Sequence, residues 1–133
     1  MKNIEYKIGI VPKTSDIIEV YASSGIKRPI SDSNRIAKMY SNSNLIVTAW
    51  SNNELIGISR SLTDFCYACY LSDLAVKNEF QNEGIGIQLI ELTKKEIGRE
   101  TALILLSAPL AMEYYPKIGF DKINNGFIVP RIE

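Results

Sequence analysis

The chain has 133 residues, of which 46% are hydrophobic and 23% are charged. This length and composition are typical of one compact globular domain, here residues 1–133, and they exclude disordered and fibrous proteins. The 15 basic residues balance the 15 acidic residues, so the overall charge predicts no general affinity for nucleic acid or for acidic membranes.

Hydrophobic patterns predict a strand and two helices in the first third of the chain. Residues 3–10 alternate apolar and polar side chains, as a strand with one buried face does. A first helix is expected to open at residues 14–16, which include good N-cap residues, and to stop before Gly25. A second is expected to open at residues 31–33 and to end after Tyr40.

Strand signals follow these helices. Residues 45–50 and 54–62 flank the turn-forming residues 51–53, which predicts a β-hairpin. Gly57 within the second of these strands indicates a bulge or a close approach of another segment. Residues 67–76 form the next expected strand.

The stretch from Leu71 to Ile97 predicts a buried strand, a glycine loop and an amphipathic helix that stops at Gly98. Residues 101–106, TALILL, are the most apolar run, which favours a fully buried, central strand. A right-handed crossover would place this strand parallel to residues 71–76 and beside them.

The C-terminal part is expected to contain a helix and a hairpin. Residues 109–118 predict a short helix with proline in its first turn. Residues 120–123 and 127–129 flank Asn124-Asn125-Gly126, which predicts a hairpin with an Asn-Gly turn.

Cys66 and Cys69 form a C-x-x-C, a spacing that also occurs in redox pairs and in zinc sites. The chain has no other cysteine and no histidine, so nitrogen and sulfur ligands cannot complete a four-ligand zinc site. Residues three apart on a strand also point to opposite faces. We therefore expect ordinary thiols and no metal site, and acid or base catalysis falls to carboxylates, tyrosines or water.

The N-terminal residues lack the continuous apolar segment of a signal peptide, and no stretch approaches the length of a transmembrane span. These features predict a cytoplasmic protein. Because the overall charge is balanced, any partner should be recognised through a local site.

The loop from Gln81 to Gly86 carries the strongest functional signal. Two glycines at a helix start let a ligand approach the backbone, where unpaired N–H groups and the helix dipole favour an anion such as phosphate. A dinucleotide fingerprint would need glycine where Leu89 stands, and a triphosphate loop would need Gly-Lys-Ser/Thr. An ordinary helix start without a ligand is the alternative.

Two motifs resemble the GNAT superfamily of acyl-CoA-dependent N-acyltransferases. The first is Q-x-x-G-x-G after a strand ending in Leu-Ala-Val, which is similar to the family motif Q/R-x-x-G-x-G/A. The second is YPKIGF at residues 115–120, which is similar to the signature Y-x-K-x-G-F, although Pro116 departs from the helix former common there. The motifs stand in the family's order, and the resemblance covers the chain from about Leu45 onward.

This resemblance implies an α/β fold with a mixed, largely antiparallel sheet, helices on both faces and a splayed central pair of parallel strands. It implies transfer of an acetyl group from acetyl-CoA to a primary amine by direct attack in a ternary complex. The acceptor would be set by the two N-terminal helices, which carry no recognisable motif. A homodimer is left open.

The resemblance and the loop chemistry together predict the residues that contact acetyl-CoA. Backbone N–H groups around the glycine loop would bind the pyrophosphate, and backbone groups at the end of the preceding strand would bond the pantetheine arm or polarise the thioester. The predicted set is Leu74, Val76, Gln81, Asn82, Glu83, Gly84, Ile85, Gly86, Ile87 and Ser107.

Two side chains are the predicted catalytic groups. Tyr115 would protonate the departing thiolate, since a tyrosine with an ordinary pKa of about 10 is protonated at neutral pH. A core tyrosine is the alternative, with Tyr114 as the fallback acid. Asp73 would be the general base or, equally, a structural acceptor of hydrogen bonds, and Tyr70 or Ser72 could hold a relaying water.

Two function classes are alternatives to an acetyltransferase. A non-catalytic acyl-CoA sensor would need the glycine loop but not Tyr115. A structural subunit that pairs through its strand edges would bind no CoA at all.

Overall fold

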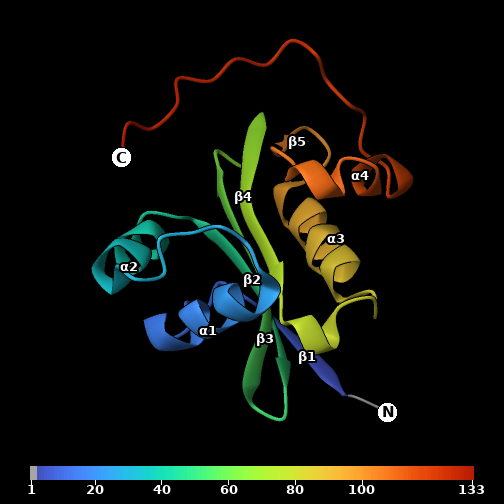
Figure 1. Cartoon of the computed structure of the whole chain (residues 1–133). Helices are drawn as coiled ribbons and strands as arrows, with labels where there is room; N and C mark the ends of the chain where they lie inside the picture. Colours follow the sequence, from blue (N-terminus) through green and yellow to red (C-terminus); the bar gives the residue numbers. More distant parts are fainter. Residues whose placement is uncertain (1–2) are drawn as a thin grey trace.

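The computed structural model describes residues 3–133, which form a five-stranded sheet with helices on both faces (Figure 1). The strands lie side by side in chain order, antiparallel except for the last pair, which is parallel. This confirms the mixed, largely antiparallel sheet. The strands are β1 (Ile4–Ile8), β2 (Leu45–Ser51), β3 (Glu54–Thr63), β4 (Ala68–Val76) and β5 (Ala102–Ile104).

Helices α1 (Thr14–Ser24) and α2 (Ser33–Ser41) lie on one side of the sheet, and α3 (Ile85–Ile97) and α4 (Tyr114–Lys117) lie on the other (Figure 1). Short 3-10 helices, η1 (Asn78–Phe80) and η2 (Pro109–Ala111), precede α3 and α4. Among the described residues, no helix has the length and apolarity needed to cross a bilayer.

Most ends of α1, α2 and α3 carry the start or stop residues that the sequence predicted. The Asp32 side chain accepts a hydrogen bond from the Arg35 N–H and so caps α2. Gly25 ends α1 in the left-handed conformation, and Gly98 ends α3. The start of α1 differs from the prediction, because its N-cap is Lys13 and no side chain caps it.

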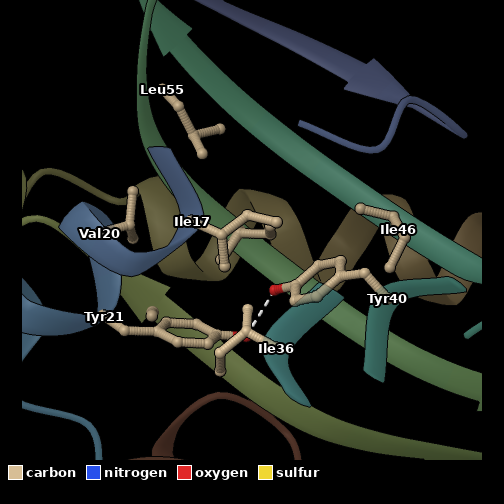
Figure 2. Packing of buried hydrophobic residues seen from close by; sticks show 9 residues of the cluster. Ile17, Val20, Tyr21, Ile36, Tyr40, Ile46 and Leu55 are labelled. Atoms are coloured by element: carbon tan, nitrogen blue, oxygen red, sulfur yellow. Dashed lines mark hydrogen bonds between the residues drawn. The ribbon is translucent and has the colours of Figure 1, made fainter. Parts of the chain in front are cut away.

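The core consists of one apolar layer on each face of the sheet. On the first face, Tyr21 and Tyr40 approach each other from α1 and α2, within a cluster of buried residues that includes Ile46 (Figure 2). On the second face, Ile85 and Leu89 of α3 pack against β2 and β3. Burial of these two layers is the main source of the fold's stability.

Gly57 lies where α3 crosses β3. A Cβ added at Gly57 would stand 3.3 Å from side-chain carbons of both Ile85 and Leu89. The β2–β3 register also shifts between Ala49 and Trp50, close to the glycine. The expected close approach is therefore confirmed, and a larger residue would push the helix away from the sheet.

The strand predicted over residues 101–106 is shorter and less buried than expected. Only Ala102–Ile104 form β5, which is an edge strand, and Ala102 and Ile104 are exposed. Apolarity alone does not distinguish a buried central strand from a partly exposed edge strand. The helix predicted over residues 109–118 is also wrong in extent, since η2 and α4 are separated by a turn.

The predicted C-terminal hairpin is wrong. Residues 120–133 contain no strand. An Asn-Gly hairpin turn needs positive φ at both central residues, but neither Asn125 nor Gly126 adopts it. The segment instead runs extended above the sheet, away from β5 (Figure 1).

The two cysteines occupy different environments, and both are free thiols. Cys66 is exposed in the turn before β4, whereas Cys69 is buried within β4. Desolvation and the negative charge of Asp64 raise the pKa of the Cys66 thiol. Neither environment favours a reactive thiolate.

Candidate active site

The parallel strands β4 and β5 separate after a short stretch of pairing. β5 pairs only with Ala68–Tyr70, with Ala68 opposite Ala102 and Tyr70 opposite Ile104. Beyond Tyr70, β4 continues to Val76 with only β3 as a neighbouring strand. The sheet therefore opens along this half of β4, where the splay was predicted.

Backbone groups of β4 point into this opening. The Lys77 N–H donates to the Ile56 carbonyl oxygen at 2.8 Å, toward β3. Because backbone direction alternates along a strand, the N–H groups of Val76 and Leu74 point the other way, into the opening. The Val76 carbonyl accepts a hydrogen bond from the Gln81 side chain at 2.9 Å. Gln81 thereby fastens the glycine loop to the end of the strand.

The glycine loop ends in an uncapped helix start. Asn82 and Gly84 both have positive φ, 65° and 81°, and they turn the chain into α3. Gly84 is the N-cap and supplies no side chain, and the Gln88 N–H makes the first hydrogen bond of the helix, to the Gly84 carbonyl at 3.0 Å. The N–H groups of residues 85–87 therefore precede the helical bonding pattern and are available to an anion.

Tyr114 and Tyr115 lie next to each other in α4, edge to face, with ring centroids 5.2 Å apart. A Cβ added at Gly86 would lie 3.8 Å from the Tyr114 hydroxyl, so this tyrosine borders the glycine loop. Tyr115 is half-buried and packs edge-on against Phe120 at 5.4 Å. Burial, with a smaller contribution from Tyr114, raises the pKa of Tyr115, which keeps its hydroxyl protonated at neutral pH.

A cavity of about 490 Å³ lies beside β5, between this strand and the C-terminal segment. Tyr115 and Ser107 both line it, and the Ser107 hydroxyl donates to the Ala108 carbonyl at 2.8 Å. The lining contains no residue of β4 or of the glycine loop. The cavity therefore lies on the β5 side of the opening between β4 and β5.

Asp73 lies in a buried network of charged and hydroxyl groups, with no exposed side-chain surface. Its carboxylate accepts hydrogen bonds from Arg28 Nε at 2.6 Å, Arg60 Nε at 2.7 Å and the Tyr21 hydroxyl at 2.6 Å. The hydroxyls of Tyr21 and Tyr40 are themselves hydrogen-bonded (Figure 2). Both oxygens of the carboxylate are thus occupied by donors.

The pKa of Asp73 follows from these contacts. Burial acts to raise the pKa of this carboxyl, but the hydrogen bonds from Arg60 and Tyr21 and the charges of Arg60 and Arg28 outweigh it, so the pKa lies below its ordinary value. Burial also raises the pKa of Tyr21. A carboxylate held this firmly in its charged form is a weak proton acceptor.

The same arginines join the segment between α1 and α2 to the sheet. Arg28 Nη2 donates to the Ser72 carbonyl at 2.7 Å, and Arg60 Nη2 donates to the Ser72 hydroxyl at 2.9 Å. Ser72 stands where the β3–β4 register shifts, between Asp73, which pairs with Arg60, and Leu71, which pairs with Ser61. The network therefore fixes the N-terminal helices to an irregular point of the strand that borders the opening.

A family model described as an acetyltransferase (GNAT) domain matches residues 17–132 of this chain. The chain belongs to the GNAT acetyltransferase family. It is an acyltransferase by that membership, and the opening between β4 and β5 corresponds to the splayed strand pair that the resemblance implied. No curated protein matches the chain significantly.

Solved structures share the GNAT fold over nearly the whole chain. A probable acetyltransferase from meticillin-resistant Staphylococcus aureus has 21% identity and a TM-score of 0.80, covering 98% of this chain and 100% of its own. A GNAT family protein from Streptococcus pneumoniae has 20% identity and a TM-score of 0.77, with coverage of 98% and 100%. An aminoglycoside N-acetyltransferase solved in complex with CoA has 11% identity and a TM-score of 0.74, with coverage of 99% and 97%.

The structure brings most of the predicted GNAT site residues together at the opening, but it places two of them at the cavity beside β5. Leu74, Val76 and the loop from Gln81 to Ile87 meet at one end of the opening, whereas Ser107 and Tyr115 line the cavity beside β5. Sequence analysis missed Arg28 and Arg60 as partners of Asp73. One signal was present, because Arg60 is a charged residue among the otherwise uncharged residues 55–63 of this strand.

Proposed function

We propose that this GNAT protein transfers the acetyl group of acetyl-CoA to a primary amine by direct attack in a ternary complex. The observation that carries this proposal is the uncapped start of α3 at the end of β4, next to the opening between β4 and β5. An anion at the helix start and an extended arm along β4 match the two halves of an acyl-CoA molecule. The structural similarity to a protein solved with CoA supports this reading.

The glycine loop would hold the pyrophosphate through backbone N–H groups from Asn82 to Ile87. The loop contains no lysine or arginine, so the helix dipole and the amides supply the attraction. Glu83 is exposed, which lets its carboxylate stay in solvent. Gln81 would position the loop through its bond to Val76.

The open N–H groups of β4 would receive the acyl end. We assign the Val76 N–H to the pantetheine arm and the Leu74 N–H to the thioester carbonyl, whose developing negative charge it would stabilise. Ser107 would approach the ligand or a bound water from the segment that leaves β5. In this arrangement the ligand takes the place of a strand beside β4.

Acetyl transfer would then need one proton to be removed from the amine and one proton to be supplied to the departing CoA sulfur. The neutral amine attacks the thioester carbon, the C–N bond forms, the C–S bond breaks, and Tyr115 gives its proton to the CoA sulfur. The amine's proton would leave through a water at Tyr70, which is partly exposed. Of the two roles left open for Asp73, the buried ion pairs favour a positioning residue that holds the N-terminal helices.

The two N-terminal helices would contact the acceptor. Aminoglycoside acetyltransferases are among the proteins with this fold, one of them solved in complex with sisomicin. We keep the acceptor as a primary amine on a small molecule or on a protein, because the helices that would contact it carry no motif.

Two measurements test this proposal. Acetyl-CoA at about one hundred times its dissociation constant should stabilise the fold by roughly 2.7 kcal/mol in a thermal unfolding assay. A panel of primary amines, followed by release of free CoA thiol, should then identify an acceptor. Stabilisation without turnover on any amine would favour the acyl-CoA sensor, and an absence of stabilisation would overturn both.

A further inference from the structure

The cavity beside β5 has an apolar lining next to the predicted proton donor. Its volume of about 490 Å³ lies within the usual range for a small-molecule site. Apolar side chains, among them Leu106 and Phe120, line it together with Tyr115. Of the described residues in the lining, Asp121 and Lys122 are the charged ones, and both are exposed. A ligand in this cavity would therefore meet apolar side chains and no net charge.

Three apolar or aromatic residues lead from the sheet to this cavity. Leu62, Tyr70 and Ile104 pair with one another across β3, β4 and β5, and they are 41%, 39% and 42% exposed. Ile104 also lines the cavity. We call these three residues the apolar row. An exposed apolar surface that continues into a cavity is typical of a ligand-binding groove.

The apolar row lies on the sheet face that α1 and α2 cover elsewhere. Cys69 and Leu103, each one position before a member of the row, pack in the layer under α3. Because side chains alternate along a strand, Tyr70 and Ile104 point to the other face. They are also the last pair in register before β4 and β5 separate. The row therefore stands beside the opening, where an amine would approach the thioester.

The carboxylates of β4 and of the turn before it are already bonded. Asp73 is held by Arg28 and Arg60. Asp64 accepts hydrogen bonds of 2.8 to 3.1 Å from the backbone N–H groups of residues 66–68. A ligand with several positive charges needs anionic partners to replace the water that it loses on binding. These two carboxylates would not supply such partners.

We propose that the acceptor is a monoamine with an aromatic or branched aliphatic body, which lies on the apolar row and in the cavity beside β5. This inference rests on the proposed acetyl transfer and names the class of its acceptor. The amino group would stand near Tyr70 and Tyr115, and the uncharged body would pack against Ile104 and Leu106. An aminoglycoside with several amino groups would lose hydration there without gaining a partner.

The reaction with such an amine needs no further reactant. The amine nitrogen bonds the acetyl carbon and the C–S bond breaks. The amine's proton leaves through the water at Tyr70, and the proton of Tyr115 goes to the CoA sulfur. Tyr115 then regains one proton from solvent, which balances the one that the amine released.

The first test measures binding without chemistry. 2-Phenylethylamine, ethylamine and the aminoglycoside sisomicin are titrated by calorimetry into the protein with and without saturating CoA, which carries no acetyl group to transfer. 2-Phenylethylamine should bind about tenfold or more tightly than either of the others, because its ring loses contact with water in an apolar pocket. Equal or tighter binding of ethylamine or sisomicin, or no binding of 2-phenylethylamine, would overturn the inference.

Leu106→Asn tests the cavity, and Leu110→Asn is its matched control. Leu106 lines the cavity and is 65% exposed, whereas Leu110 is 101% exposed and lies outside the lining. Leu106→Asn should reduce the ratio of 2-phenylethylamine affinity to ethylamine affinity about fivefold or more, since the ring loses an apolar contact. Both ligands carry one amino group, so this ratio reports on the ring. Leu110→Asn should leave the ratio unchanged, and an unchanged ratio in Leu106→Asn would contradict the assignment of the cavity.

Initial rates with acetyl-CoA separate this inference from the proposed function. We expect kcat/KM for 2-phenylethylamine to exceed that for sisomicin about tenfold or more. Leu106→Asn should raise KM for 2-phenylethylamine and leave the stabilisation by acetyl-CoA unchanged. Faster turnover of sisomicin would overturn the class of acceptor and keep acetyl transfer. Binding of 2-phenylethylamine that depends on Leu106, without turnover of any amine, would instead contradict acetyl transfer and keep the ligand class of the cavity.

Discussion

At the scale of single residues, Asp73 and Tyr115 differ in how firmly their surroundings hold them. Asp73 is enclosed by Arg28, Arg60 and Tyr21, whereas the Tyr115 ring packs edge-on against the rings of Tyr114 and Phe120. A buried, fully bonded charge is suited to stability and position, while a protonated hydroxyl with a raised pKa is suited to donating a proton. Their substitutions should therefore separate folding from turnover.

Asp73→Asn should destabilise the protein by about 3–5 kcal/mol, because it removes one partner of a buried ion-pair network and leaves two arginines without compensation. Urea unfolding at neutral pH measures the change. Asp121→Asn, at an exposed position that follows α4, is the control and should change stability little. A loss of turnover in Asp73→Asn at unchanged stability would instead restore the general-base role.

The same residue predicts a pH dependence. The pKa of Asp73 is lower in the folded protein than its ordinary value of about 3.9. The unfolded chain therefore binds this proton first, and the stability from Asp73 is present above about pH 4 and is lost as the pH falls through the folded value. In urea unfolding at pH values from about 6 down to 3, the difference between the unchanged protein and Asp73→Asn should shrink. A constant difference would contradict the ion-pair assignment.

Tyr115→Phe should lower single-turnover acetyl transfer about a hundredfold, the low end for general acid catalysis, because a thiolate leaves fairly well unaided. Acetyl-CoA affinity and melting temperature should stay near those of the unchanged protein. Tyr114→Phe is the matched comparison, since its hydroxyl borders Gly86 instead of the cavity beside β5. A larger rate loss in Tyr114→Phe would move the acid role to that residue.

At the scale of elements, the glycine loop shows why two glycines one residue apart need not have the same role. Gly84 has a φ of 81° and so needs glycine for its conformation, whereas an added Cβ would meet nothing within 4 Å. Gly86 has no such φ, and an added Cβ would make only an ordinary contact, 3.8 Å from the Tyr114 hydroxyl. A substitution at Gly86 should therefore block the approach of a ligand without straining the backbone.

Gly86→Val should keep the fold and abolish the stabilisation by acetyl-CoA, because the new side chain would occupy space at the exposed helix start. Thermal unfolding with and without acetyl-CoA measures both effects. Gly84→Val should also abolish binding, but with strain of roughly 1–3 kcal/mol in the free protein. If Gly86→Val still binds acetyl-CoA as tightly as the unchanged protein, the loop is an ordinary helix start.

At the scale of the whole molecule, the sheet ends in two edge strands, β1 and β5. β2, β3 and β4 each lie between two strands, and α1 to α3 cover both faces. Residues 121–133 belong to neither core layer, although they include apolar side chains such as Phe127 and Val129. The two core layers are therefore complete without this segment.

The sequence by itself determined the central part of this protein. Residues 71–97 predicted a strand, a glycine loop and a helix, and the structure has them as the second half of β4, the loop at Gln81–Gly86 and α3. These features depend on local rules, namely hydrophobic period, glycine conformation and helix stop signals, which act within a few residues. The family assignment rested on the same stretch and on residues 115–120, and it is confirmed.

Tertiary structure alone decided the surroundings of Asp73 and the fate of the C-terminus. Asp73 meets Arg60 through strand pairing and Arg28 through a loop 45 positions away in the sequence, and no local pattern encodes a contact of that range. The apolar pattern of residues 120–129 predicted a hairpin, but a pattern states only that a segment can be buried against something. In the structure these residues pair with no described strand, and a segment forms a strand only where its backbone groups find a neighbour, which local pattern does not specify.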